Sequence, residues 1–178
     1  MVRQKTTTFP TMKKRMLLLL AVASSVSFAL TSVRAANDEK EIRAMIDRYE
    51  IAFQAKDVAT VMTFYAPGDR VVAFDIVPPL AKTGHEAYRK NFEDFFAGYE
   101  GPLQTEIRDM KVMVSGDVGF LTCLERISGV LKGGQKSDLW CRVTSGLNKI
   151  GGKWLIVHDH VSVPVDFETG KALLELKP

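Results

Sequence analysis

Two histidines lie two residues apart in the last apolar segment of the chain, residues 151–164. They are His158 and His160, and the protein has only one other histidine. Side chains two residues apart in a β-strand share one face, which here also carries Ser162. Because histidine titrates near neutral pH, this pair could transfer protons or hydrogen-bond a ligand. We interpret this face as the wall of a ligand pocket; histidines hydrogen-bonded within the sheet are the alternative.

A carboxylate could supply the base for chemistry beside a carbonyl group. Asp75 ends an apolar stretch shortly before Pro78-Pro79. A carboxyl group in an apolar cavity has a raised pKa, which suits proton abstraction next to a carbonyl. Asp75 and His158 are therefore the candidate catalytic residues, with a turn-capping role as the alternative for Asp75. Asp159 falls on the opposite, apolar face of its strand and is predicted to be an outer carboxylate.

Helical and strand periodicities predict the elements that must position these residues. Apolar residues at helical spacing predict three helices, over residues 38–56, 57–65 and 85–99. Apolar stretches bounded by Gly and Pro predict strands over residues 70–76, 103–115, 118–132, 135–148 and 154–164. Helices followed by a long antiparallel meander indicate an α+β fold. We expect a cone-shaped barrel, in which a strongly bent, mostly antiparallel sheet is wrapped by three N-terminal helices around an internal pocket.

The turns between the last strands predict which residues face one another. A two-residue turn at Gly133-Gly134 and a three-residue turn at residues 150–152 place Glu125, Arg142 and His160 in one row across three strands. Arginine is always charged and presents a planar fork of donors, so Arg142 could bind a ligand carboxylate or stabilise an oxyanion. Glu125 would then hold it in place, and an internal ion pair between the two is the alternative.

The same register predicts the remaining pocket residues. Trp140 and Ser162 share the next row, and Tyr49 is a candidate wall residue from the first helix. The predicted ligand-binding set is Arg142, His160, Trp140, Glu125, Ser162 and Tyr49. The register also points Cys123 and Cys141 to opposite faces, which argues against a disulfide. The chain has no CxxC, HxxxH or HExxH motif, so neither a metal site nor a cofactor is expected.

The N-terminal residues predict a secretory signal peptide. Lys13-Lys14-Arg15 precedes an apolar run over residues 16–30, and small residues follow up to Ala35. Cleavage after Ala35 would leave residues 36–178 as a single domain with a core at 38–165 and a short C-terminal tail. Met12 is the more typical start, and an uncleaved anchor helix is the alternative. The protein is thus expected to be periplasmic or secreted, with no membrane span after cleavage.

Removal of residues 1–35 reverses the sign of the net charge. This segment carries six basic and no acidic side chains, so the formal charge changes from +3 to −3. No cluster of Lys and Arg remains, which argues against nucleic-acid binding.

The order of the elements and several short motifs resemble a known family. The motifs are Val72-Ala73-Phe74-Asp75, Gly84-His85-Glu86-Ala87, Trp140-Cys141-Arg142-Val143-Thr144 and the segment 152–164. They resemble the SnoaL-like branch of the ketosteroid isomerase and nuclear transport factor 2-like superfamily, over about residues 38–165. The resemblance implies a cone-shaped α+β barrel with an internal pocket, commonly a homodimer through the outer sheet face.

Two functions remain open from the sequence. The first is a pocket for a small, partly apolar molecule that bears a carbonyl or carboxylate group. The second is a cofactor-independent isomerase, cyclase or dehydratase that abstracts a proton next to a carbonyl. The superfamily contains both enzymes and binding domains, so the fold does not choose between them.

Overall fold

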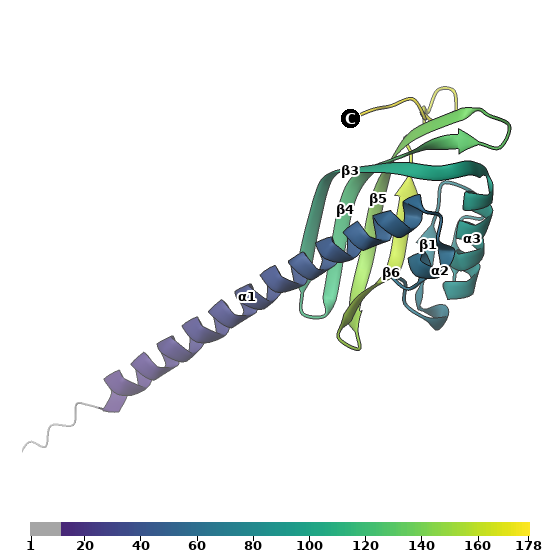
Figure 1. Ribbon diagram of the computed structural model, residues 1–178. Helices are drawn as coiled ribbons and strands as arrows, with labels where there is room; N and C mark the ends of the chain where they lie inside the picture. The colour runs from purple at the N-terminus through teal and green to yellow at the C-terminus, as the bar shows by residue number, and fades with distance from the viewer. Residues whose placement is uncertain (1–11) are drawn as a thin grey trace, which may run out of the picture. The chain divides into compact units, whose positions relative to one another are not determined.

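The computed structural model describes the backbone of residues 12–178 and the side chains of residues 33–178 (Figure 1). The chain divides into two compact units, residues 1–37 and 38–178. Helix α1 (Met12–Gln54) begins in the first unit and ends in the second. The side chains of the predicted basic stretch and apolar run lie outside the described residues, as does the segment before Met12. Within the described part of the chain, no helix combines the length and apolar character needed to cross a membrane.

The first helix starts earlier than predicted. It was expected to begin at residue 38, but the helix continues through this position and Asp38 is buried. The Oδ1 atom of Asp38 accepts hydrogen bonds from Lys149 Nζ at 2.6 Å and from Trp154 Nε1 at 3.3 Å. The carboxylate therefore ties α1 to the sheet instead of capping a helix end.

Two further helices follow the predicted pattern. Helix α2 (Val58–Met62) is capped by Asp57, which accepts a hydrogen bond from the Thr60 backbone N–H at 3.0 Å. A short 3₁₀ helix (Gly68–Arg70) follows. Helix α3 (His85–Ala97) buries Tyr88, Phe92 and Phe96 along one side.

Six strands form one open sheet in the order β2-β1-β6-β5-β4-β3. Their bounds are β1 (Val72–Phe74), β2 (Lys82–Thr83), β3 (Tyr99–Ser115), β4 (Val118–Leu131), β5 (Lys136–Ile150) and β6 (Lys153–Ser162). All neighbours are antiparallel except β1 and β6, which are parallel. The α+β class and the bent, mostly antiparallel sheet are thus confirmed. The two-residue strand β2 was not predicted, and the C-terminal tail contains no helix.

The predicted strand register is wrong at both hairpins. In the first, Val130 pairs with Lys136 and the Leu131 N–H donates to the Gln135 carbonyl, so the turn has three residues, 132–134, instead of the expected two. In the second, Ile150 pairs with Lys153, which leaves Gly151-Gly152 as a two-residue turn. Both of these glycines have positive φ, 58° and 79°, as a type I′ turn requires. A shift of one residue moves every side chain of a strand to the other face.

A bulge near the middle of β6 changes its faces a second time. Leu147 pairs with Ile156 and Gly146 with His158, so Val157 is an extra residue without a partner across the strand pair. Before the bulge, Trp154 and Ile156 are buried; after it, the buried residue is Asp159. The strict alternation assumed from the sequence therefore fails between these positions.

The hydrophobic core lies between the helices and the inner face of the sheet. In the second unit, the final turns of α1 lie with α2 and α3 against one face of the sheet (Figure 1). The core includes Ile42, Met45 and Phe53 of α1, Phe92 and Phe96 of α3, and Leu121, Leu147 and Ile156 of the sheet. The helices do not cover the other face of the sheet (Figure 1), which Lys177 of the C-terminal tail reaches through Asp138, 3.6 Å away.

Candidate functional site

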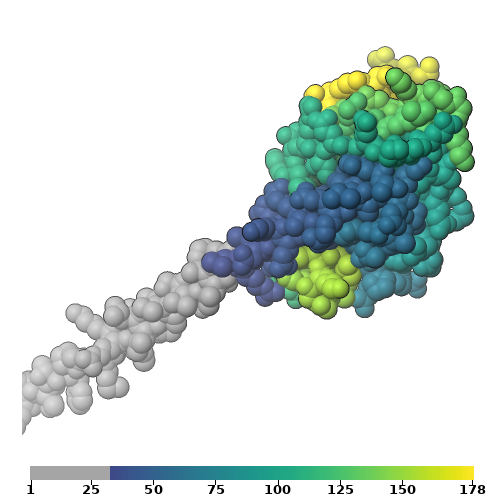
Figure 2. All heavy atoms as spheres, viewed as in Figure 1, coloured from purple at the N-terminus to yellow at the C-terminus, as the bar shows by residue number. Residues whose placement is uncertain are grey.

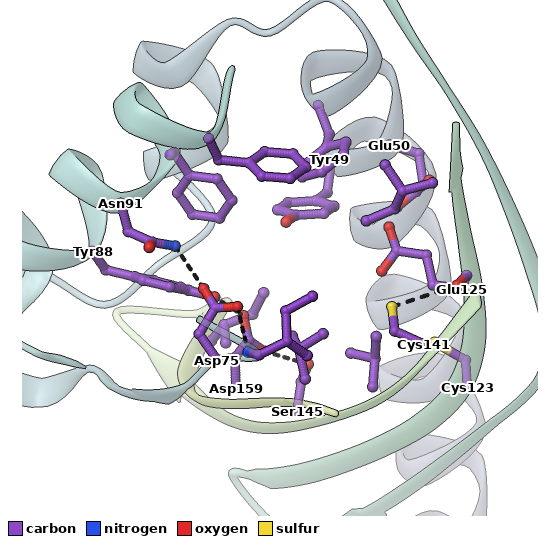
Figure 3. A pocket seen from close by; sticks show the side chains of 18 of the residues that line it. Tyr49, Glu50, Asp75, Tyr88, Asn91, Cys123, Glu125, Cys141, Ser145 and Asp159 are labelled. Carbon is purple, nitrogen blue, oxygen red and sulfur yellow. Dashed lines mark hydrogen bonds between the residues drawn. The ribbon is translucent and has the colours of Figure 1, made fainter. Parts of the chain in front are cut away.

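A cavity of about 140 Å³ lies inside the second unit, between the helices and the inner face of the sheet. In the space-filling view, the atoms of the helices cover this face of the sheet (Figure 2). The walls are mainly apolar and aromatic, with a small number of polar groups, as in most small-molecule sites. Figure 3 shows these polar side chains converging from α1, α3 and the strands.

The buried carboxyl group of Asp159 is the centre of the largest polar cluster in the cavity. Asp159 Oδ2 accepts hydrogen bonds from the hydroxyls of Tyr65, at 2.6 Å, and Tyr88, at 3.4 Å. Its Oδ1 accepts a short hydrogen bond from the Ser145 hydroxyl. The hydroxyl of Tyr49 lies 3.5 Å from that of Tyr65 and extends the cluster across the cavity. Three donors from separate segments of the chain thus meet at one carboxyl group.

Burial and hydrogen bonding act in opposite directions on Asp159. Burial raises its pKa, while the hydrogen bonds from Ser145, Tyr65 and Tyr88 lower it, and the resulting pKa is about 6. Burial also raises the pKa of each tyrosine well above its usual value. The tyrosines therefore remain protonated donors, while Asp159 can gain and lose a proton near neutral pH.

Asp75 lies at another part of the cavity wall, just after β1. Its Oδ2 accepts a hydrogen bond from Asn91 Nδ2 at 2.7 Å, and its Oδ1 accepts one from the Ile76 backbone N–H at 2.7 Å. Lys82 Nζ lies 3.8 Å from Oδ2. Asp75 therefore lines the cavity and also caps a turn, while its role as a base stays a prediction.

Two further carboxyl groups, those of Glu50 on α1 and Glu125 on β4, lie at the other end of the inner sheet face. Burial and then the nearby Glu50 raise the pKa of Glu125 well above its usual value. Burial also raises the pKa of Glu50, which a hydrogen bond from Thr105 partly offsets. Glu125 Oε1 is buried and has no hydrogen-bond partner among the described residues.

Both cysteines line the cavity beside Glu125. They are free thiols, and Cys141 donates a hydrogen bond to the Glu125 carbonyl at 3.4 Å. Burial raises the pKa of Cys123 to about 12 and raises that of Cys141 as well. The predicted orientation on opposite faces is wrong, because the register shift places both side chains on the inner face.

Three of the predicted site residues line the cavity, namely Asp75, Tyr49 and Glu125. Their chemical roles stay predictions. The other five, His158, His160, Arg142, Trp140 and Ser162, are not among the residues that line it. Cys141, Val143 and Ser145 of β5 point into the cavity, so the alternate residues Trp140 and Arg142 point to the outer face. The predicted pairing is also wrong, because Arg142 pairs with Leu124 and Ser162, while Glu125 pairs with Cys141.

The bulge moves the two histidines out of the pocket. His158 Nδ1 lies 2.8 Å from the Val72 carbonyl, and both imidazole rings contact the ring of Phe74. His158 is thus a structural histidine bonded within the sheet, the alternative to a pocket histidine. In its place, the bulge turns Asp159 inward, so the prediction of an outer carboxylate is wrong.

Several polar residues of the cavity were not predicted from the sequence. They include Asp159, Tyr65, Tyr88, Ser145 and Glu50. Only Asp159 carried a usable signal: it is the one charged residue on an otherwise apolar strand face. A charge in that position is costly unless it is paired or hydrogen-bonded, which points to buried partners.

Comparisons with known proteins agree on the family of this fold. A profile of the SnoaL-like domain matches residues 42–166. No curated protein matches the chain.

Among the described residues, no cluster of His, Cys, Asp and Glu could hold a metal ion.

Several solved structures are similar to this chain. An NTF2-like protein of unknown function from Pseudomonas putida is 33% identical with a TM-score of 0.73, covering 81% of this chain and 99% of its own. A nuclear transport factor 2-like superfamily protein from Salmonella enterica is 18% identical, with a TM-score of 0.68 and coverage of 77% and 98%. A ketosteroid isomerase-like protein from Erwinia carotovora is 22% identical, with a TM-score of 0.59 and coverage of 69% and 93%. The last two similarities concern the fold alone.

Proposed function

The chain belongs to the SnoaL-like domain family, and we propose that its internal cavity binds a small, partly apolar carbonyl compound and transfers a proton beside the carbonyl. The observation that carries this proposal is Asp159, a buried carboxyl group with three donors and a pKa of about 6 at the wall of an apolar cavity. A general base works best when its pKa lies near the operating pH.

The geometry divides the work among the residues of the cluster. At neutral pH the Asp159 carboxylate accepts a proton from the carbon next to the carbonyl, and the electron pair of the broken C–H bond moves to the carbonyl oxygen. Tyr65 and Ser145 hold the carboxylate in place. Tyr49, whose hydroxyl is 3.5 Å from that of Tyr65, is positioned to donate a hydrogen bond to the enolate oxygen. The protonated Asp159 then returns the proton, at the same carbon or at another.

Proton exchange tests this function without knowledge of the natural substrate. The protein is incubated in deuterated water with a panel of small cyclic and aryl ketones, and loss of the α-proton signals is followed by NMR. We expect exchange on at least one compound, and a fall of about 100- to 10,000-fold in Asp159→Asn, the usual contribution of a general base. Asp75→Asn is the matched control. A greater loss in Asp75→Asn than in Asp159→Asn would assign the base to Asp75 and contradict the proposal.

The carboxylate-bearing ligands considered from the sequence lose their support. That expectation rested on Arg142, which lies on the outer face of the sheet. Of the described residues, those that line the cavity include no Lys, Arg or His.

We also propose that two copies of the chain pair through the outer sheet face. Phe74, Met113 and Phe120 are 41%, 60% and 39% exposed on this face, although large apolar side chains are usually covered. Sedimentation of the wild type and of Phe120→Arg tests the pairing, with a monomer expected for the variant.

Residues 1–35 are proposed to be a removable leader for export to the periplasm or the medium. The boundary between the two compact units, after residue 37, supports a folded domain that begins near residue 36. The mass of the protein recovered from its own cells tests this, since cleavage after Ala35 fixes the mass of the remaining chain.

A further inference from the structure

Glu125 is the one carboxyl group of the cavity that the protein leaves without a hydrogen-bond partner at a buried oxygen. Its Oε1 atom has no partner among the described residues, whereas both oxygens of Asp159 and of Asp75 accept hydrogen bonds. Figure 3 shows the Glu125 side chain directed into the cavity, with Glu50 nearby. A buried carboxylate without a partner is unfavourable, so this group awaits either a proton or a donor.

The nearby carboxyl group of Glu50 makes it still less favourable for Glu125 to be charged without a positive partner. The two carboxyl groups come from facing elements, α1 and β4, and the charge of Glu50 raises the pKa of Glu125. Thr105, which donates a hydrogen bond to Glu50, accepts one from Gln54 at 2.7 Å and carries no charge. Of the described residues that line the cavity, none is a Lys, Arg or His, while four are acidic: Glu50, Asp75, Glu125 and Asp159. A cleft lined by one sign of charge attracts ligands of the opposite sign.

The aromatic walls of the cavity suit a cation with an apolar body. The aromatic residues of the cavity are Tyr49, Phe53, Tyr65, Tyr88, Phe92, Phe95 and Tyr99. The face of an aromatic ring attracts a cation, and aromatic walls are the usual means of binding organic ammonium groups. The volume of about 140 Å³ is close to that of an engineered cavity of about 150 Å³ that holds benzene.

We propose that the Glu125–Glu50 end of the cavity binds the ammonium group of a small amino ketone that carries one aromatic or alicyclic ring. This assignment rests on the proposed function, because it names the class of molecule that enters the same cavity. The Asp159 end does not compete for the ammonium group, since its carboxylate is already held by three donors.

The separation of the two ends limits the length of the molecule. Cys141 pairs with Glu125 and Ser145 pairs with Asp159, and these two residues of β5 are four positions apart. This corresponds to roughly 14 Å along the strand backbone. The side chains of Glu125 and Asp159 shorten this distance where they lean toward one another. A molecule with a single ring and a short aminoalkyl chain can therefore place its amine at Glu125 and its reacting carbon at Asp159.

Three probes of nearly the same shape test the assignment: 2-phenylethylamine, 2-phenylethanol and 3-phenylpropionate. Each is titrated into the full chain at pH 7.5, and affinity is measured from NMR chemical shifts. We expect the amine to bind at least ten-fold more tightly than the alcohol, and the carboxylate to bind more weakly than both. Glu125→Gln should lower the affinity for the amine at least ten-fold and change that for the alcohol less than two-fold.

Two further variants complete the test. Glu50→Gln is expected to weaken amine binding as well, and it replaces Glu125→Gln if that variant fails to fold. Glu106→Gln removes an exposed carboxylate on β3, paired with Arg108 at 2.7 Å, and should leave all three affinities unchanged.

The outcomes separate this inference from the proposed function. If the alcohol binds as tightly as the amine, or if both glutamate variants keep the amine affinity, the inference is wrong while the cavity remains a binding site. If none of the three probes binds, the inference is wrong, and the proton-exchange assay tests the proposed function separately. Proton exchange that depends on Asp159 would still support the chemistry at the other end.

Discussion

The two ends of the cavity contain the same chemical group in opposite environments. At one end, Asp159 is buried and accepts hydrogen bonds from Tyr65, Tyr88 and Ser145. At the other end, Glu125 is half-buried beside a second acid, and its buried Oε1 atom has no partner among the described residues. The hydrogen-bond donors hold the pKa of Asp159 at about 6. At Glu125, burial and the nearby acids raise the pKa, and no hydrogen bond from a described residue lowers it. The comparison shows that hydrogen-bond donors, more than burial, decide which carboxyl group is ready to act as a base.

The largest expected effect is the loss of proton exchange in Asp159→Asn. The amide keeps the size of the side chain but cannot accept a proton, so exchange should fall about 100- to 10,000-fold. The NMR exchange assay measures this directly. Unchanged exchange in the variant would remove Asp159 as the base and with it the difference between the two ends.

The next effect concerns the donors of Asp159. Tyr65→Phe removes the 2.6 Å hydrogen bond, and a hydrogen bond to a charged group contributes about 1.5–3 kcal/mol. The pKa of Asp159 should rise, so the acidic limb of the pH–exchange profile should move to higher pH. Tyr88→Phe, which removes only the 3.4 Å contact, is the matched control and should move that limb less. Equal profiles in wild type and Tyr65→Phe would contradict the role given to this donor.

A smaller effect is expected for the stability of Glu125→Gln. The folded-state pKa of Glu125 is raised above its unfolded value of 4.5, so its neutral form favours folding and its ionised form opposes it. This contribution is fully present below the unfolded pKa and is lost as the pH rises through the folded pKa. The variant should therefore gain stability relative to the wild type above pH 4.5, by about 1 kcal/mol at pH 8. Urea unfolding at pH 4 and pH 8 measures the difference, and a gain that is equal at both values would argue against an ionisable cause.

The smallest effect is expected for Arg142→Ala. This residue was predicted from the sequence to bind the ligand, but it is exposed on the outer face of β5. Its removal should change the affinity for cavity ligands less than two-fold. The same titrations with 2-phenylethylamine and 2-phenylethanol measure this. A ten-fold loss would mean that the ligand site extends to the outer face.

The predicted elements and the observed elements agree closely for most of the chain. Apolar spacing located α3 and the four long strands, and the predicted break between the first two helices near residue 57 is confirmed. These features depend on residues that are neighbours in the sequence, so local rules suffice. The start of α1 was missed because Asp38 forms its contacts with Lys149 and Trp154, which lie far along the chain.

The candidate site was much harder to predict than the fold. Asp75, Tyr49 and Glu125 were placed in the cavity, whereas His158, His160, Arg142, Trp140 and Ser162 were not. The loop between β4 and β5 is one residue longer than expected, and the loop between β5 and β6 is one residue shorter. In addition, β6 contains a bulge. Each such change exchanges the two faces of a strand, so small local errors reversed the side of the sheet on which the histidines lie.

The sequence by itself determined the α+β class, the order of the helices and strands, and the resemblance to the SnoaL-like family, because apolar periodicity and turn residues are local properties. The tertiary structure alone decided that Asp159, and not His158, faces the cavity. It also brought together Tyr49, Tyr65, Tyr88 and Ser145, which come from separate elements. Which side of a bent sheet a residue occupies depends on loop length and bulges, and which donors meet a carboxylate depends on packing between distant segments.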